Sequence, residues 1–452
     1  MTKEEILKDI DNLGAEVLFG FIQLGIVTLD ELRKTRKLDH SKRLNITDMI
    51  RQAEADLQVE LNKDKDAWGL ARYGMEEDLR KYISEFPKGR YVDEAKIKIV
   101  EFQAEKERKK SERDLILRDL RENFKNHELS NFKQVVKQYN LTHNELLEIG
   151  LPSEILQSLN KINSYTLNLG SFPKAIPNGF TEVYFWGSPG SGKTCALGSI
   201  IGTADKNGML TIKEGLGFNY VTDLKNIFKE NPVNLPPPTP FHDIQYLPIA
   251  IQKNKKSKPL AISLMEISGE IFECFYYKVA GLAYPSEDHK RIFENFVKIV
   301  ENNESTNRKI HFFFIDYEKG GKLDSKRKRQ DDYLSATVKY LNRSEVLDKS
   351  TDAIYLIVTK ADLMPVAKDE RINHAKEYLT SNFPSFVENL KSICSEKSIN
   401  SDELLYDVFS IGDIYFKDLA ILDSSPAENI LEIFTDRVKR ERFRRARKIF
   451  KG

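Results

Sequence analysis

The 452-residue chain contains few cysteines, and they are scattered. Cys195, Cys274 and Cys394 stand singly, with none of the short spacings that disulfide frameworks and zinc clusters use. Their absence favours a reducing compartment and a fold that needs no covalent cross-links. We expect each thiol to be a small buried apolar side chain.

The chain also lacks a long apolar run. Its best candidate for a membrane span, residues 13–27, is shorter than the ~20 residues required and contains Glu16 and Gln23. The first residues, MTKEEILKDIDNLG, carry mixed charges where a secretory signal has a basic stretch and then an apolar one. These features predict a cytoplasmic protein.

The chain has no excess of charge of one sign either, because its 70 Lys and Arg residues are balanced by 69 Asp and Glu residues. Attraction to nucleic acid, membranes or acidic partners must therefore be local. One basic segment, SKRKRQDD at 325–332, is either a solvated loop or a contact for phosphate or a partner. A second, 436–452, predicts a basic C-terminal helix with Phe443 and Phe450 on a narrow apolar stripe. That helix either packs on the protein or contacts an anionic membrane, nucleic acid or an acidic partner.

The distribution of apolar residues divides the chain into parts. Residues 1–165 show apolar positions three and four apart, which predicts a helical regulatory or interaction domain. Residues 166–180 contain two prolines and two glycines, which predicts a linker. Within the helical part, Tyr82, Phe86 and Ala95 flank a Pro-Gly turn that resembles the turn of tetratricopeptide-like helix pairs. An ordinary helical hairpin accounts for the same residues, because only one such unit is visible.

Short apolar runs alternate with helical stretches from 181 to 435. This alternation predicts an α/β domain with a mainly parallel sheet and helices on both faces. The second and third runs are joined by a connection too short for a crossover, so they are expected to pair antiparallel at an edge of the sheet. The predicted strands are 182–186, 244–251, 260–267, 309–316, 353–359 and 406–411.

A glycine-rich segment follows the first predicted strand and precedes a predicted helix. This is the context of a phosphate-binding loop, in which backbone N–H groups and the helix N-terminus face phosphate oxygens. Lys193 would neutralise the β- and γ-phosphates, and Thr194 would offer its hydroxyl to Mg²⁺. The alternative is an ordinary glycine turn. The segment consists of Gly187, Ser188, Pro189, Gly190, Ser191, Gly192, Lys193 and Thr194.

Two further motifs stand at the ends of later strands. Glu266 to Gly269 ends the third run, and Thr359-Lys360-Ala361-Asp362 ends the fifth. With the phosphate loop they resemble, in order, the motifs of the translation-factor-related, Ras-like P-loop GTPases over about residues 180–435. Ligands of open parallel sheets bind beyond the carboxyl ends of the strands, so all three motifs are expected to meet in one crevice.

The resemblance implies roles for individual residues. Asp362 would accept the guanine N1–H and amino group, and the stem of Lys360 would cover the base, with Thr359 beginning the motif. Thr239 would contact Mg²⁺ and the γ-phosphate, although the prolines before it are also consistent with a rigid spacer. Ser410 resembles the weak serine motif near the guanine carbonyl, and a plain strand end is the alternative. Taken alone, TKAD is also consistent with a helix cap.

Two positions depart from the family pattern. Glu266 stands where an Asp is usual, so Mg²⁺ would be reached by a longer arm or through a water. Glu270 stands where a Gln commonly orients the attacking water. A carboxylate at that position either serves as a base or repels the γ-phosphate and slows hydrolysis. About sixty residues also separate the phosphate-loop helix from the strand of Glu266, which suggests switch and partner-binding insertions.

The sequence thus predicts a Ras-like P-loop GTPase that binds GTP or GDP with Mg²⁺, preceded by a helical domain. Lys193, Thr239 and Glu270 are the expected catalytic residues; Thr194, Thr239 and Glu266 are the expected metal ligands. The nucleotide state would control an unidentified protein partner through the helical domain and the insertions. The main alternative is a scaffold in a bacterial secretion or defence assembly that holds GTP without hydrolysing it. A third, an ATPase, requires TKAD to be accidental.

Overall fold

The structure is a computed structural model, and it describes residues 1–126, 128–159, 167, 172–241, 244–252, 257–397, 399 and 404–436. The chain divides into two compact units, residues 1–116 and 117–452. The predicted basic C-terminal helix at 436–452 lies, apart from its first residue, outside the described residues.

The first unit is helical, as predicted. The hydroxyls of Thr2 and Thr28 each accept a hydrogen bond from the backbone N–H three residues on. The glutamate at that later position accepts in turn from the threonine N–H, and this capping box fixes the start of each short helix. The apolar sides of the first three helices pack on the beginning of the long fourth one. The helices are α1 (Lys3–Lys8), α2 (Ala15–Gln23), α3 (Leu29–Lys34), α4 (His40–Ala71), α5 (Glu76–Glu85) and the first part of α6 (Val92–Asn123).

The turn between α5 and α6 lies where the sequence predicts one. Tyr82 donates to Asp64 on α4 at 2.5 Å, and the other oxygen of Asp64 accepts from the Arg90 N–H at 2.9 Å. A Cβ at Gly89 would lie 2.5 Å from the Asp64 carboxylate, so glycine is required. Ala95 is fully buried, which lets α6 approach closely. The hairpin is therefore held by a buried polar contact as well as by apolar packing.

The second unit begins inside α6, earlier in the chain than the linker predicted at 166–180. The end of α6 and the helices that follow it belong to this unit, in which Phe124 stacks on Tyr415 and Phe132 packs against Phe416 at a tilted angle. These elements are η1 (Phe124–Asn126), α7 (Leu129–Gln138), α8 (His143–Glu148) and α9 (Ser153–Ser158).

A seven-stranded sheet, mostly parallel, forms the centre of the second unit. Four of its five parallel strands consist of an apolar run that is mostly buried on both faces, which is the pattern of a sheet covered by helices, and the fifth, at the edge of the sheet, is half-buried. The strand order is β2-β4-β5-β1-β6-β7-β8. The strands are β1 (Thr181–Trp186), β2 (Leu210–Ile212), β4 (Ile244–Ile251), β5 (Leu260–Ile267), β6 (Arg308–Asp316), β7 (Thr351–Thr359) and β8 (Leu405–Phe409).

All six predicted strands are present, and the α/β class is confirmed. β4 and β5 pair antiparallel along their whole length, from Ile244 opposite Ile267 to Ile251 opposite Leu260. The structure adds to this sheet one strand that the sequence did not predict. β2 pairs antiparallel with the outer side of β4, so β4 is not itself the outermost strand.

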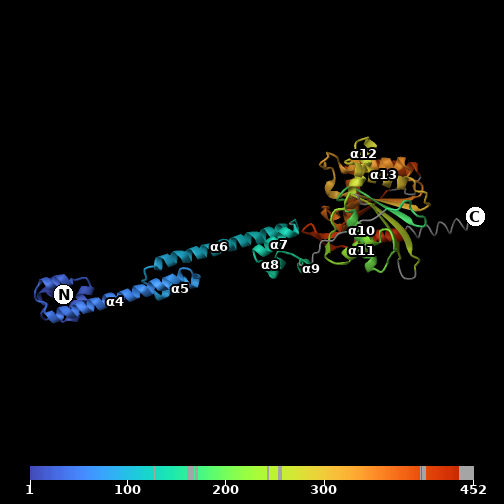
Figure 1. The fold of residues 1–452 in the computed structure, drawn as a ribbon. Coiled ribbons are helices and arrows are strands. Elements are labelled where there is room, and N and C mark those ends of the chain that lie inside the picture. The colour runs from blue at the N-terminus through green and yellow to red at the C-terminus, as the bar shows by residue number, and fades with distance from the viewer. Residues whose placement is uncertain are drawn as a thin grey trace, which may run out of the picture. The chain divides into compact units, whose positions relative to one another are not determined.

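Helices cover both faces of this sheet. Figure 1 shows α10 and α11 on one face and α12 and α13 on the other, and two separate apolar cores correspond to these layers. A helix over 425–436 packs with the α10 layer through Ile430, Leu431 and Phe434. The helices are α10 (Lys193–Lys206), α11 (Phe218–Lys229), α12 (Gly269–Ala280), α13 (Glu287–Glu301), α14 (Gln330–Arg343), α15 (Arg371–Asn382) and α16 (Pro384–Glu396), with 3₁₀ turns η2 (Tyr317–Lys319), η3 (Ala361–Leu363) and η4 (Lys368–Glu370).

A second, three-stranded antiparallel sheet joins segments that are distant in the sequence. It consists of β3 (Val233–Asn234), β10 (Leu419–Leu422) and β9 (Gly412–Tyr415), in that order. Leu419 lies opposite Asn234, and the Leu235 N–H donates to the Asp418 carbonyl at 2.7 Å. The hairpin of β9 and β10 therefore holds the segment that leads toward Thr239.

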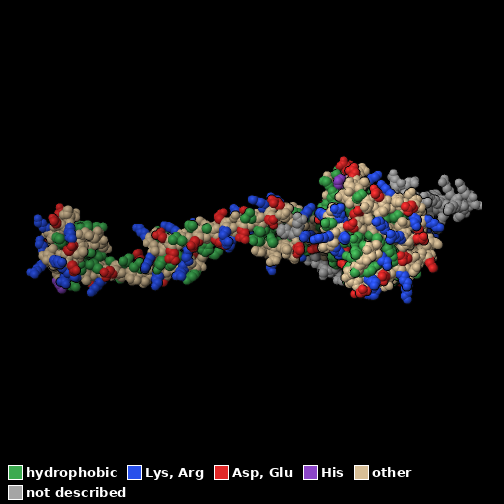
Figure 2. All heavy atoms as spheres, turned by 90° about the horizontal axis from the view of Figure 1, so that it is seen from above, with side chains coloured by type: hydrophobic (Ala, Val, Ile, Leu, Met, Phe, Trp, Pro, Cys, Tyr) green, Lys and Arg blue, Asp and Glu red, His purple; other side chains and the backbone are tan. Residues whose placement is uncertain are grey.

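Basic and acidic side chains are interspersed on the face of the molecule seen in Figure 2, in keeping with the near-zero net charge. The predicted basic segment 325–332 is not simply solvated. Lys326 lies 2.6 Å from the carboxylate of Glu273 on α12, and Gln330 donates to Ser188 at 2.9 Å. Among the described helices, none has the length and apolar character needed to cross a membrane.

Candidate functional site

The loop between β1 and α10 contains the predicted phosphate-binding residues Gly187 to Thr194. Gly192 has φ of 78°, in the left-handed region that glycine adopts without strain, and it is the N-cap of α10. Because α10 begins at Lys193, the free N–H groups of its first turn point back toward the loop. The local backbone therefore has the form of an anion-binding helix N-terminus.

Lys193 is buried against this loop. Its Nζ donates to the carbonyl of Gly187 at 2.6 Å and to that of Ser188 at 3.2 Å. Burial lowers the pKa of Lys193 to about 8, and the nearby carboxylate of Glu266 opposes that shift. A buried ammonium held only by neutral carbonyls lacks a full counter-charge, so an anion placed in the loop is electrostatically favoured.

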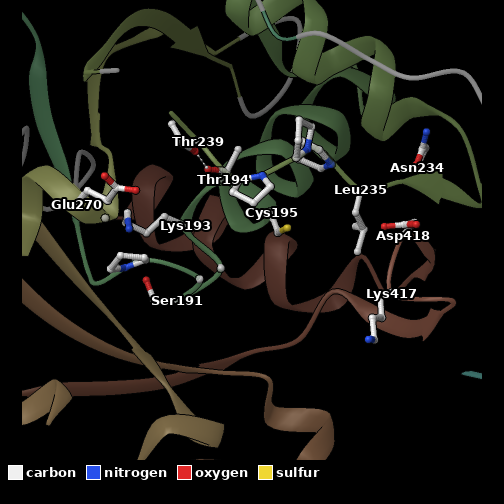
Figure 3. A pocket seen from close by; sticks show the side chains of 17 residues that line it. Ser191, Lys193, Thr194, Cys195, Asn234, Leu235, Thr239, Glu270, Lys417 and Asp418 are labelled. Atoms are coloured by element: carbon white, nitrogen blue, oxygen red, sulfur yellow. Dashed lines mark hydrogen bonds between the residues drawn. The ribbon is translucent and has the colours of Figure 1, made fainter. Parts of the chain in front are cut away.

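Three oxygen-bearing side chains from separate elements converge beside the loop. The Thr194 hydroxyl donates to Glu266 at 2.5 Å and lies 2.9 Å from the Thr239 hydroxyl (Figure 3). Because the Thr194 hydrogen is used, the Thr239 hydroxyl is the donor in that second bond. Tyr220 of α11 donates to the other carboxylate oxygen of Glu266 at 3.0 Å, which fixes its orientation.

This donor set fits a small divalent cation such as Mg²⁺, which prefers oxygen ligands and binds few side chains at a time. Thr194, Thr239 and Glu266 would hold the cation, with phosphate and water completing its shell. In the described ranges, no group of three or more His, Cys, Asp or Glu residues could hold a metal ion.

A cavity of about 620 Å³ opens beside these residues. Figure 3 shows Glu270 and Lys193 at one end of the view and Lys417 and Asp418 at the other. Its described lining comes from four segments that are distant in sequence: 189–195, 234–239, 269–270 and 417–418. The three prolines before Thr239 also line the cavity, so this segment forms part of its wall.

The start of α12 packs closely against the loop that precedes α10. A Cβ at Gly269 would lie 2.2 Å from the backbone nitrogen of Pro189, so no side chain fits at this position. The next residue, Glu270, lines the cavity with a side chain that is 52% exposed. Its Oε2 lies 3.1 Å from Nε2 of His289. The Gly269 contact thus sets Glu270 beside the loop.

The TKAD segment begins next to the loop that precedes α10, but none of its four residues is among the described residues that line the cavity. A Cβ at Gly192 would lie 3.7 Å from the Thr359 side chain. Lys360 has φ of 56°, and its Nζ lies 3.0 Å from Asp316 and 2.8 Å from Glu318. Asp362 is exposed, and neither it nor the buried Ser410 is among the described residues that line the cavity.

The comparisons add nothing to this picture. No protein-family model matches the chain, and no curated protein is similar enough to count as a match.

Several residues of the site carried no sequence signal. Lys417 and Asp418 lie on a short hairpin whose strands are only four residues long, and Tyr220 stands in an ordinary amphipathic helix. Phe241 belongs to the insertion before β5, which the sequence marks as functional in general without naming a residue, and His289 lies in the first turn of α13. Each reaches the site through a contact between segments far apart in the chain, which a local pattern does not reveal.

Proposed function

We propose that this protein is a Mg²⁺-dependent GTP-binding protein of Ras-like fold that hydrolyses GTP to GDP and phosphate. The observation that carries the proposal is the meeting of Thr194, Thr239 and Glu266 beside the buried Lys193. The strand order β4-β5-β1-β6-β7-β8 supports it, since the motifs follow β1, β5 and β7 at the carboxyl ends of parallel strands in one sheet, with β5 next to β1 and β6 between β1 and β7.

In this proposal the β- and γ-phosphates occupy the loop around Lys193, and the base lies beyond β7. Mg²⁺ would supply charge that stabilises the phosphates and the leaving oxygen. Asp362 accepts the two guanine donors, and the ion pairs of Lys360 with Asp316 and Glu318 hold the lysine stem along the base. Adenine presents an acceptor at N1, which favours GTP over ATP.

The γ-phosphate would order the segment around Thr239 and the turn at Gly269, and hydrolysis would release them. The path from the cavity toward the helical part runs through the second sheet. The Phe416 N–H donates to the Lys125 carbonyl at 3.0 Å, and its ring lies 4.4 Å from that of Phe132 on α7. The same hairpin holds Leu235. A movement of residues 234–239 would therefore shift α7 and the end of α6, and these helices would pass the change on to a partner protein.

The second candidate is a cytoplasmic scaffold that binds GTP without hydrolysing it. It is favoured by Glu270, since a carboxylate at the Lys193 end of the cavity adds negative charge where the γ-phosphate would lie. A bacterial secretion or defence assembly is the kind of setting that fits this alternative.

Nucleotide binding and turnover separate the candidates. The full chain is titrated with labelled GTP, with ATP as competitor, with and without Mg²⁺; then GTP is incubated with micromolar protein and GDP is measured. GTP preference, Mg²⁺ dependence and GDP formation are expected for the first candidate. Binding without GDP formation supports the scaffold, and equal competition by ATP contradicts a guanine site.

A further inference from the structure

A chain of polar contacts joins Glu270 to the start of α13. Nε2 of His289 lies 3.1 Å from Glu270 Oε2, and Nδ1 lies 2.7 Å from the Ser286 hydroxyl. A carboxylate oxygen accepts, so Nε2 of His289 carries the hydrogen of the bond to Glu270. Ser286 is also the N-cap of α13, since its oxygen accepts from the His289 N–H at 3.3 Å. The ring is therefore held at both nitrogens.

The same ring contacts the segment that bears Thr239. The Phe241 ring stacks on His289 with centroids 4.4 Å apart and an angle of 11°. The Phe241 carbonyl accepts from the hydroxyl of Ser268, the N-cap of α12, at 2.9 Å. His289 thus packs on the segment before β4 and also bonds to the first turn of α12. Its side chain is 14% exposed, whereas that of Glu270 is 52% exposed.

We propose that His289 is a positioning residue for GTP hydrolysis that holds the Glu270 carboxylate toward the attacking water. A free glutamate would turn away from the negative γ-phosphate into solvent. The His289 bond occupies Oε2, and in the described part of the chain Oε1 accepts no hydrogen bond, so Oε1 is left for the water. The inference rests on the proposed function and answers the objection that an acidic side chain would avoid the phosphate.

The water oxygen forms a bond to the γ-phosphorus while the bond from that phosphorus to the β–γ bridging oxygen breaks, and GDP leaves with the bonding electrons. The water proton passes to Oε1 of Glu270 and from there to solvent or to the phosphate product. His289 gives up no proton; its N–H only orients the carboxylate. It acts through Glu270 and does not touch the nucleotide.

The test is single-turnover hydrolysis with the full chain in excess over GTP and with Mg²⁺ present. We expect Glu270→Ala to lower the rate at least tenfold and His289→Ala to lower it about tenfold, each with GTP affinity changed less than about threefold. His289→Gln, whose amide can donate to Oε2, retains most of the rate. The double variant is no slower than Glu270→Ala alone, because His289 acts only through that carboxylate.

A matched control is His374→Ala, which removes another histidine that contacts a hydroxyl, that of Tyr317 at 3.1 Å, and does not line the cavity. Its rate should equal that of the wild type. The inference alone is overturned if Glu270→Ala is slow while His289→Ala is not, if the two losses multiply in the double variant, or if Glu270→Ala is faster. A wild type that binds GTP and forms no GDP overturns hydrolysis and the inference together, and absent GTP binding overturns the proposed function itself.

Discussion

The hydroxyl of Thr239 lies 2.9 Å from that of Thr194, although 45 residues separate the two in the chain. Thr194 lies in the first turn of α10, and Thr239 follows three prolines in an insertion. The contact places the segment of Thr239, which would respond to the γ-phosphate, beside Thr194, which would bind Mg²⁺. This relationship makes Thr239 the first target for substitution.

Thr239→Val keeps the shape of the side chain and removes its hydroxyl. We expect affinity for a slowly hydrolysed GTP analogue to fall at least fivefold and affinity for GDP to change less than twofold, because only the γ-phosphate orders this segment. Thr239→Ser retains the hydroxyl and should behave as the wild type. Isothermal titration with Mg²⁺ measures all three proteins, and equal loss for both nucleotides would contradict the assignment.

Lys193→Ala removes the buried ammonium from the loop. Nucleotide binding should be abolished, since the cation neutralises phosphate charge at close range. The helical unit of residues 1–116 should remain folded, because its two apolar cores contain no residue of the loop. Binding is measured by titration and helix content by circular dichroism. Unchanged nucleotide affinity would rule out a phosphate loop.

Asp362→Asn tests how the base is read. If the carboxylate accepts both guanine donors, the amide leaves one of them facing another donor, which costs about 1–3 kcal/mol, or roughly tenfold or more in affinity. Xanthine carries an oxygen where guanine carries its amino group, so the variant should come to prefer XTP. Competition by GTP, ATP and XTP against one labelled nucleotide measures the ranking. If the ranking does not change, Asp362 does not contact the base.

Phe416→Ala tests the path from the cavity to the helices. The Phe416 ring is fully buried and packs on Phe132. In the wild type we expect amide hydrogen exchange of α7 to differ between the GDP and GTP-analogue states, and this difference should vanish in Phe416→Ala and persist in Phe416→Leu. Exchange that is independent of nucleotide in the wild type would show that the hairpin transmits nothing.

His311 predicts a dependence of stability on pH. The residue is fully buried on β6, the strand between β1 and β7, and its Nδ1 accepts from Trp186 at 3.0 Å. Burial lowers the pKa of His311 to about 3. Below about pH 6.5 the unfolded chain binds a proton at this residue, and the folded chain does so only near pH 3. The free energy of unfolding therefore decreases as the pH is lowered through this window, and His311 contributes about 2 kcal/mol of that decrease between pH 7 and pH 5.

His311→Gln keeps an acceptor for Trp186 and should lose about 2 kcal/mol less than the parent over the same range. Urea unfolding is followed by fluorescence of Trp186 in a Trp68→Phe background, which leaves one tryptophan of the chain's two. An equal loss in both proteins would show that His311 is protonated in the folded state.

The sequence by itself determined the main strands and the position of the glycine-rich loop from Gly187 to Thr194. Each main strand is an apolar run bounded by polar or helical stretches, and a run that is buried on both faces can be recognised without its neighbours. The Gly187 to Thr194 segment follows the same logic, because its glycines, its lysine and the helix after it are all local. Even the antiparallel pairing of β4 and β5 follows from a connection too short to cross the sheet.

Only the tertiary structure decided which of the remaining residues meet. β3 is two residues long and pairs with a hairpin almost two hundred residues later, so its pattern carries no period to detect. The contact of His289 with Glu270 and that of Lys417 with the cavity arise in the same way. Such contacts are specified by the summed packing of two apolar cores and not by spacing along the chain, which is why a local pattern could predict the loop but not the residues gathered around it.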